Sequence, residues 1–126
     1  MKRRKVPEWM LTRSIIDYFE YFTGNCWGLD SAEQLKLLNL NSREELFKLK
    51  HSREGLPEEI VIRIDYLAKI IECLQILLPD RIAADAWIRK PNDNVLFGGK
   101  PALDKMTSGK LEDLKAVRDY LMSECV

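Results

Sequence analysis

Apolar residues recur at helical spacing along most of the chain. After Pro7, bulky apolar side chains return every three or four positions until Gly24, which suits the end of a helix. The longest stripe of this kind lies in residues 57–78 and comprises Ile60, Ile64, Leu67, Ile71, Leu74 and Leu78. These patterns predict a first helix up to Gly24 and a long central helix over residues 57–78.

Two shorter helices are predicted between these two, and each begins with a capping pattern. Asp30 stands three residues before Glu33, and Ser42 stands three residues before Glu45, as in a capping box. Asn39 tolerates the left-handed backbone that ends a short helix. The two helices at about residues 31–51 therefore have the layout of a helix-turn-helix, whose second helix enters the major groove of DNA.

The rest of the chain predicts three more helices around one unusual loop. Asp80 can cap a helix that stops before Pro91, Pro101 can start a single turn, and a final helix follows Gly109. Between them lies PNDNVLFGGKP, residues 91–101. The loop and its flanks carry more large apolar side chains than a linker usually has, at Trp87, Val95, Leu96, Phe97 and Leu103.

Together these elements predict an all-α, compact helical protein, because no segment shows the period-two alternation of a half-buried strand. A chain of 126 residues suits one domain of common size. The expected organisation is a helix-turn-helix-like region over residues 1–56, followed by the long central helix and a C-terminal helical region over residues 57–126.

Charge restricts the partners. The chain holds 20 basic and 20 acidic residues, so its overall charge attracts neither nucleic acid nor anionic lipid, and any DNA site must be a local patch. Glu44 and Glu45 would place negative charge close to DNA phosphates, and the N-terminal KRRK segment is either a DNA-binding arm or a solvated tail. The candidate DNA-binding residues are Arg3, Arg4, Ser42, Arg43, Lys48, Lys50 and Arg53.

The residue inventory offers little for catalysis or metal binding. The three cysteines are far apart and lack a C-x-x-C pair, and His51 is the single histidine, so neither a disulfide nor a metal site is expected. We find no nucleophile with a base, no paired-carboxylate signature and no phosphate-binding glycine loop, which argues against an enzyme and implies no cofactor. No stretch approaches the ~20 apolar residues of a membrane helix, and no signal peptide is recognisable, so a cytoplasmic protein is expected.

The segment AADAWIRKPNDNVLFGGKPALDKMTSGKLEDLKAVRDYL combines a tryptophan near a helix end, Pro-Asn, a Gly-Gly turn, a small apolar helix and a final helix after glycine. In this order and spacing it resembles the toxin-binding domain of the Xre/MbcA/ParS antitoxin family. The residues that carry the resemblance are Trp87, Pro91, Asn92, Phe97, Gly98, Gly99, Pro101, Leu103, Met106, Gly109, Leu114, Val117 and Leu121.

The first half of the chain is also similar to that family. WGLDSAEQLKLLNLNSREELFKLK resembles its helix-turn-helix portion, with a turn one residue longer than is common and Glu44–Glu45 in place of small polar residues. The resemblance implies a homodimeric antitoxin that neutralises a toxin of the RES type, which consumes NAD, and that often represses its own operon. Apolar residues on more than one stripe of the long helix also predict a homodimer. The leading alternative is a stand-alone DNA-binding regulator without a toxin partner.

The antitoxin interpretation places the toxin-binding residues in the loop and on the exposed side of the final helix. Two alternatives are open at this point: the loop only braces the last helix, and Arg118 forms an intramolecular ion pair with Asp113 or Asp119. The expected toxin-binding residues are Phe97, Gly98, Gly99, Lys100, Lys115, Arg118, Asp119 and Met122.

Overall fold

The computed structural model describes the backbone of residues 8–125 and the side chains of residues 11–125. The candidates Arg3 and Arg4 lie outside the described residues. Helices and turns follow one another without a strand in the described range, and one isolated bridge joins Pro91 to Pro101. The predicted all-α class is confirmed. The elements are α1 (Glu8–Tyr21), the π-helical turn η1 (Phe22–Cys26), α2 (Ser31–Leu37), α3 (Arg43–Lys50), α4 (Glu58–Leu77), α5 (Arg81–Ala86), the 3₁₀ turn η2 (Trp87–Arg89), α6 (Ala102–Met106) and α7 (Leu111–Glu124).

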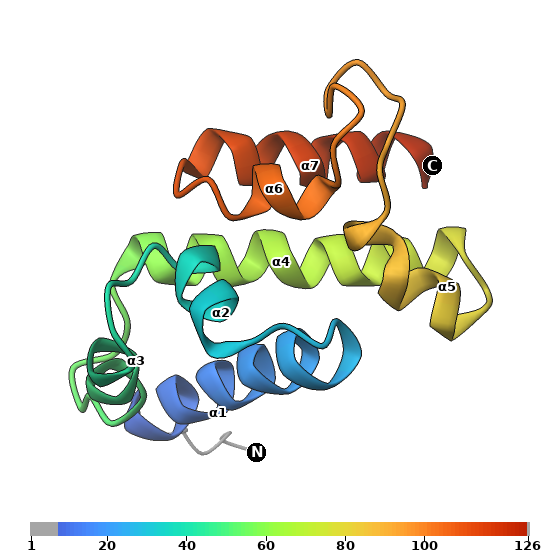
Figure 1. Cartoon of the computed structure of the whole chain (residues 1–126). Coiled ribbons are helices and arrows are strands. Elements are labelled where there is room, and N and C mark those ends of the chain that lie inside the picture. Colours follow the sequence, from blue (N-terminus) through green and yellow to red (C-terminus); the bar gives the residue numbers. More distant parts are fainter. Residues whose placement is uncertain (1–7, 126) are drawn as a thin grey trace.

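The long helix α4 is the centre of the fold, as predicted. In Figure 1, α6 and α7 lie along one side of α4, and α1 lies along the opposite side. The contacts bury Leu67, Ile70 and Leu74 of α4 completely or nearly so, together with Val117 of α7 and Phe19 of α1. Two of the apolar stripes of α4 are thus covered within one chain, because α1 and α7 pack on different faces of it.

The helix caps follow the sequence prediction closely. Asp30 Oδ1 accepts a hydrogen bond from the Glu33 amide at 2.8 Å, and the Asp30 amide donates to Glu33 Oε1 at 3.0 Å, which completes a capping box. Ser42 Oγ accepts from the Glu45 amide at 3.2 Å, and Asp80 Oδ1 accepts from the Ile82 amide. Asn39 has the expected left-handed backbone, with φ of 56°.

The first helix ends later than predicted. Gly24 was expected to end it, but the chain continues from Phe22 to Cys26 as a π-helical turn. Thr23 Oγ1 donates to the Phe19 carbonyl at 2.6 Å and accepts a hydrogen bond from Gln34 Nε2 at 2.9 Å. A Cβ atom at Gly24 would lie 3.4 Å from Gln34 Nε2, an ordinary van der Waals contact, so Gly24 lies beside α2 within the π-helical turn and does not end the helix.

One buried charged side chain ties the two halves of the chain together. Arg63 of α4 is 1% exposed. Its Nη2 donates to the Gly109 carbonyl at 2.7 Å and lies 3.2 Å from Glu59 Oε1, and its Nη1 donates to the Leu37 carbonyl at 3.4 Å. The end of α2 and the turn before α7 are therefore fastened to the same point of α4.

No helix in the described part of the chain is both long enough and apolar enough to cross a membrane.

Candidate interaction surfaces

The loop over residues 91–101 has one defined shape, which its own backbone and asparagine side chains hold. The Asn92 amide donates to the Lys100 carbonyl, and the Gly99 amide donates to the Asn92 carbonyl at 3.0 Å, so the two ends of the loop are joined. Asn94 Oδ1 accepts from the Leu96 amide at 2.9 Å, and the Asn94 carbonyl accepts from the amides of Phe97 and Gly98. Gly98 and Gly99 have positive φ angles of 58° and 81°, which glycine adopts without strain.

An aromatic cluster fixes this loop on the helices. Phe97 is 6% exposed and packs edge-on against Trp87 and Tyr120, with ring centroids 5.9 and 5.6 Å apart. Trp87 and Tyr120 also stack on each other at 6.5 Å. Phe97 therefore supports the loop from inside and presents little surface to a partner, although the sequence placed it among the toxin-binding candidates.

The tip of the loop presents one apolar side chain to solvent. Val95 is 96% exposed, between Asn94 and the half-buried Leu96. Next to it, a hollow of about 220 Å³ is lined by Leu96, Phe97 and Lys100 of the loop and by Asp104 of α6. Single exposed apolar residues are common, but this one stands on a loop whose conformation is already fixed.

The candidates on α7 lie on a different side of that helix from the loop. Tyr120 faces the loop, and Arg118, two residues earlier, points about 200° away around the helix. Lys115 and Met122 are three and four residues from Arg118 and share its stripe. The expected toxin-binding set is thus divided between two surfaces.

Arg118 makes the intramolecular contacts that one alternative predicted. Its Nη2 lies 2.7 Å from Asp119 Oδ1, its Nε donates to the same oxygen at 2.9 Å, and its guanidinium carbon sits 4.5 Å from the centre of the Tyr66 ring on α4. Asp113 pairs with Lys105 and Ser108 instead, and the hydrogen bond from Ser108 lowers the pKa of the Asp113 carboxyl. Lys115 lies 3.4 Å from Asp119.

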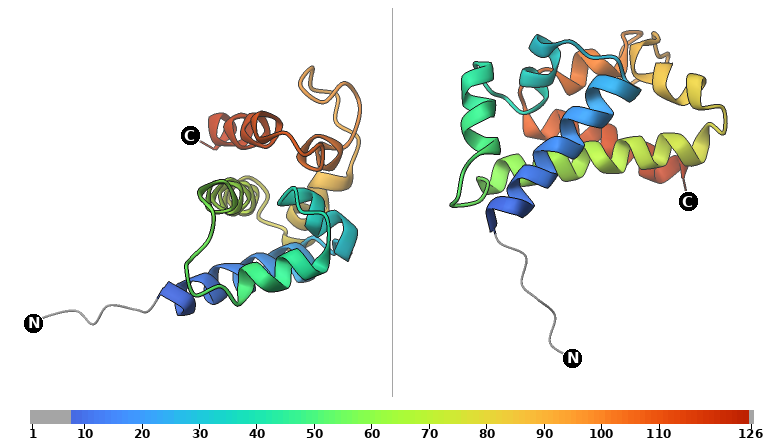
Figure 2. Two further views of the ribbon diagram at one scale, coloured as in Figure 1. Left: turned by 90° about the vertical axis from the view of Figure 1, so that its left-hand side faces the viewer. Right: turned by 90° about the horizontal axis from the view of Figure 1, so that it is seen from below.

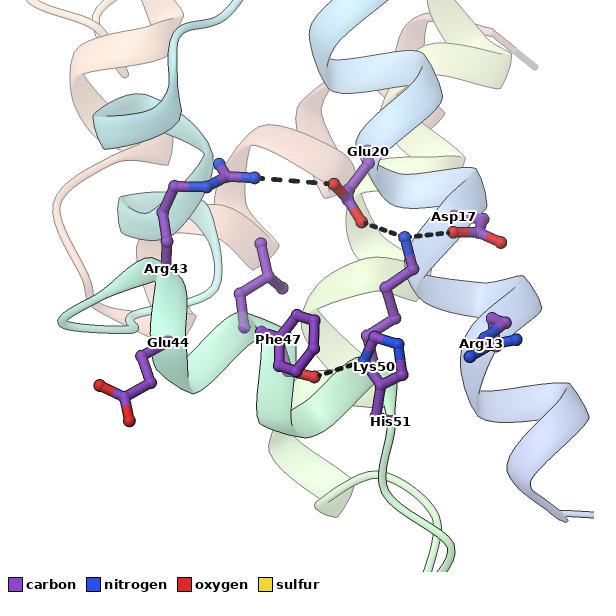
Figure 3. Close-up of a pocket in the computed structure, with 9 residues that line it drawn as sticks. Arg13, Asp17, Glu20, Arg43, Glu44, Phe47, Lys50 and His51 are labelled. Carbon is purple, nitrogen blue, oxygen red and sulfur yellow. Dashed lines mark hydrogen bonds and ion pairs between the residues drawn. The ribbon is translucent and has the colours of Figure 1, made fainter.

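A second surface lies between α1 and α3, where the DNA-binding candidates were expected. Figure 3 shows a hollow of about 630 Å³ with Arg43 reaching toward Glu20 and with Lys50 between Asp17 and Glu20. Lys50 Nζ lies 2.7 Å from Asp17 Oδ1 and 3.1 Å from Glu20 Oε1, and hydrogen bonds to these carboxylates raise its pKa. Lys50 is therefore largely neutralised by α1.

The other predicted DNA contacts are divided between paired and unpaired side chains. Ser42 caps α3, Arg43 Nη1 donates to Ser31 Oγ at 2.7 Å, and Lys48 lies 3.5 Å from Glu44. Arg53 forms no ion pair with any described side chain. It lines a smaller hollow with Arg13, Lys50 and His51. Arg13 was not among the predicted candidates. It lines this hollow because it lies on the side of α1 that faces the end of α3.

The remaining chemistry is sparse in the described range. No group of three or more metal-ligating side chains comes together among the residues that the structure describes. All three cysteines are free thiols, and Cys125 Sγ lies 3.9 Å from the carbonyl oxygen of Cys73. Burial raises the pKa of the Cys73 thiol to about 11, and the hydrogen bond with Cys125 adds to this.

Comparison with known proteins assigns the C-terminal part of the chain to a domain family. Residues 73–124 match the family model of the antitoxin Xre/MbcA/ParS C-terminal toxin-binding domain, a range that includes α5, the loop, α6 and α7. The uncharacterized protein y4oB of Sinorhizobium fredii (strain NBRC 101917 / NGR234) is 40% identical over 95 residues, which is 75% of this chain and 72% of the relative. The chain belongs to the Xre/MbcA/ParS antitoxin family. No solved structure matches this antitoxin.

The family assignment means that the protein is the antitoxin of a toxin-antitoxin system and that its partner is a toxin. The matched domain starts near the end of α4 and leaves α1, α2 and α3 outside it. The helix-turn-helix-like pair therefore belongs to the part of this antitoxin that the family model does not cover.

Proposed function

We propose that this antitoxin neutralises a cognate RES-type, NAD-consuming toxin in the cytoplasm and that it does so by binding alone, without catalysis or a cofactor. The observation that carries the proposal is the coincidence of the matched toxin-binding domain with a loop already held in one conformation. A loop that is ordered before binding loses little conformational entropy when the partner arrives.

The toxin-facing residues that we propose are those of the loop surface. Gly98, Gly99 and Lys100 are exposed, and the two glycines allow a partner's backbone to approach closely. Val95 would insert into an apolar recess of the toxin, while Phe97 holds the loop from behind. The α7 candidates Lys115, Arg118, Asp119 and Met122 form a second set on a different surface.

Co-expression with the toxin encoded next to this chain tests the proposal. Wild-type protein should restore growth and co-purify with the toxin. The loop variant Val95→Asp/Lys100→Glu should lose both properties while it stays folded by circular dichroism. Lys36→Glu on α2, an exposed position outside the loop, is the charge-reversal control. A toxin that is not bound by wild type, or that is bound equally well by the loop variant, would refute the proposed surface.

We further propose that the protein is a homodimer that binds its own operator. The supporting observations are the two short capped helices α2 and α3 and the basic group of Arg13, Lys50, His51 and Arg53 beside them. The alternative function, a stand-alone DNA-binding regulator, requires only this part of the chain. It would be favoured if wild-type protein bound its promoter but did not co-purify with the neighbouring toxin.

A further inference from the structure

The side of the molecule formed by α1, α4 and α7 is not covered by any other described element. In the left view of Figure 2, α4 and α7 are seen end-on, and the loop, α6 and α2 all lie on the other side of this pair. We call this uncovered side the open side. Its large exposed apolar residues are Tyr18 and Tyr21 of α1, Val61 and Ile76 of α4, and Met122 of α7.

Several contacts place these residues on one continuous surface. Tyr18 and Tyr21 line a groove of about 280 Å³ together with Ala68 and Gln75 of α4. Val61 lies two turns before Ala68 on the same stripe of α4. On the opposite edge of α4, Arg118 sits over the ring of Tyr66, and Cys125 contacts Cys73, so the outer stripe of α7 borders the outer stripe of α4.

We propose that the open side binds a second copy of this chain, with the α4 helices of the two copies facing each other. This proposal rests on the homodimer proposed above and names its surface. It also reassigns Lys115, Arg118 and Met122, which lie on the open side, from the toxin to the partner copy.

The chemistry of the surface fits a second copy better than a polyanion. Acidic side chains on or beside the open side, Asp65, Glu72 and Asp119, are matched by the basic Lys69, Lys115 and Arg118. A surface that meets itself across a two-fold axis needs charges of both signs, whereas DNA needs an excess of positive charge. Tyrosine and methionine among apolar residues are also typical of protein interfaces.

The size of the open side suits a stable dimer. Such a dimer buries about 800 Å² on each partner, which is roughly a tenth of the 8048 Å² surface of this chain. The helix α4 has 20 residues and is therefore about 30 Å long, and α1 and α7 widen the surface on either side. The toxin-binding loop stays accessible because it lies on the other side of α7.

Sedimentation equilibrium and light scattering over a hundredfold range of concentration test the proposal. Wild type should have twice the 14.7 kDa mass of the chain. Ile76→Asp and Tyr21→Glu should each raise the dimer dissociation constant at least tenfold, and the double variant should be a monomer with an unchanged circular dichroism spectrum. Phe47→Asp is the matched control, because Phe47 is 62% exposed on α3 and Ile76 is 61% exposed on α4.

A wild-type monomer at every concentration would overturn the inference, as would a dimer that survives the double variant or that Phe47→Asp dissociates. Toxin co-purification separates this inference from the proposed toxin surface. Val95→Asp should stay dimeric while it loses the toxin, and Lys115→Glu should retain the toxin. Loss of toxin from a Lys115→Glu variant that remains dimeric would return the α7 stripe to the toxin and would contradict the reassignment.

Discussion

At the scale of single residues, the most consequential side chain is the buried Arg63. It was not among the residues predicted to be buried, although it stands three residues after Ile60 and four before Leu67, within the apolar stripe of the long helix. What the sequence did not reveal are its partners, the carbonyl groups of Leu37 and Gly109, since these lie 26 and 46 residues away. A buried charge is tolerated only where such partners neutralise or solvate it.

Arg63→Met should destabilise the fold strongly. The substitution preserves an apolar stem but leaves the carbonyl oxygens of Leu37 and Gly109 without their donor, at an expected cost of about 2–4 kcal/mol. Urea denaturation followed by circular dichroism measures this. Glu59→Gln is the control, because the Glu59 side chain is 57% exposed and the exposed end of this ion pair should contribute less than about 1 kcal/mol. Equal midpoints for the two variants would show that the buried hydrogen bonds are not stabilising.

Cys73 should resist alkylation in the folded protein. Thiol reagents attack the thiolate, and burial raises the pKa of Cys73 to about 11, so very little thiolate exists at pH 8. Iodoacetamide followed by peptide mass spectrometry should label Cys26 first and Cys73 last. The unfolded chain ionises Cys73 at a pKa of about 9, whereas the folded protein keeps the neutral thiol up to a pKa of about 11. The contribution of Cys73 to the free energy of unfolding is therefore fully present below pH 9 and declines as the pH rises toward 11. Rapid labelling of Cys73 at pH 8 would contradict the buried environment.

At the scale of elements, the sequence predicted the helices well because their signals are local. Asp30, Ser42 and Asp80 act on amides two or three residues ahead, and α4 carries its own apolar stripe. The predicted end of the first helix at Gly24 was wrong. Gln34, which lies on another helix, packs against Gly24 and donates a hydrogen bond to the carbonyl of Glu20, 14 residues away in sequence. The loop was expected to be ordered. The division of the toxin-binding set between two surfaces depends on how α7 is rotated, and the contacts of α7 with Tyr66 and Phe97 show this rotation.

The order of the loop depends on Asn94. Its side chain and carbonyl accept hydrogen bonds from the amides of Leu96, Phe97 and Gly98. Asn94→Ala should speed hydrogen exchange at the Leu96 amide at least tenfold and change global stability by less than about 1 kcal/mol, since the loop is on the surface. Asp93→Ala is the control, because Asp93 is exposed and makes no hydrogen bond with the described residues. Unchanged exchange in Asn94→Ala would mean that the backbone and Phe97 hold the loop without this side chain.

At the scale of the whole molecule, the three proposed partners occupy different sides: the toxin at the loop, the second copy at the open side, and DNA at α3. The sequence predicted candidate regions but not their separation, because net charge and periodicity do not specify which helix faces meet. The DNA surface changed most. Arg43, Lys48 and Lys50 were expected, together with the basic N-terminal arm, to be the main contributors to DNA binding. All three have acidic neighbours from α1 or α3.

Operator binding should therefore be weak and salt-dependent. The basic residues Arg13 and Arg53 near the end of α3 should contribute more to it than the residues in the N-terminal half of α3. Each phosphate contact adds about 0.9 to the slope of log affinity against log salt concentration.

Arg13→Ala/Arg53→Ala removes two cations that have no ion pair with the described side chains and should lower that slope by about 1–2. Arg43→Ala/Lys48→Ala, the matched control, removes two cations that already have acidic neighbours, and it leaves Glu44 without Lys48 and Glu20 with Lys50 alone. A smaller change in slope is therefore expected from lost phosphate contacts. Fluorescence anisotropy with the chain's own promoter between 50 and 200 mM salt, roughly the range over which such contacts are resolved, measures both. The reverse order would show that the ion pairs of Arg43 and Lys48 exchange for phosphates on binding, and that α3 contacts DNA through its N-terminal half, as the second helix of a helix-turn-helix does.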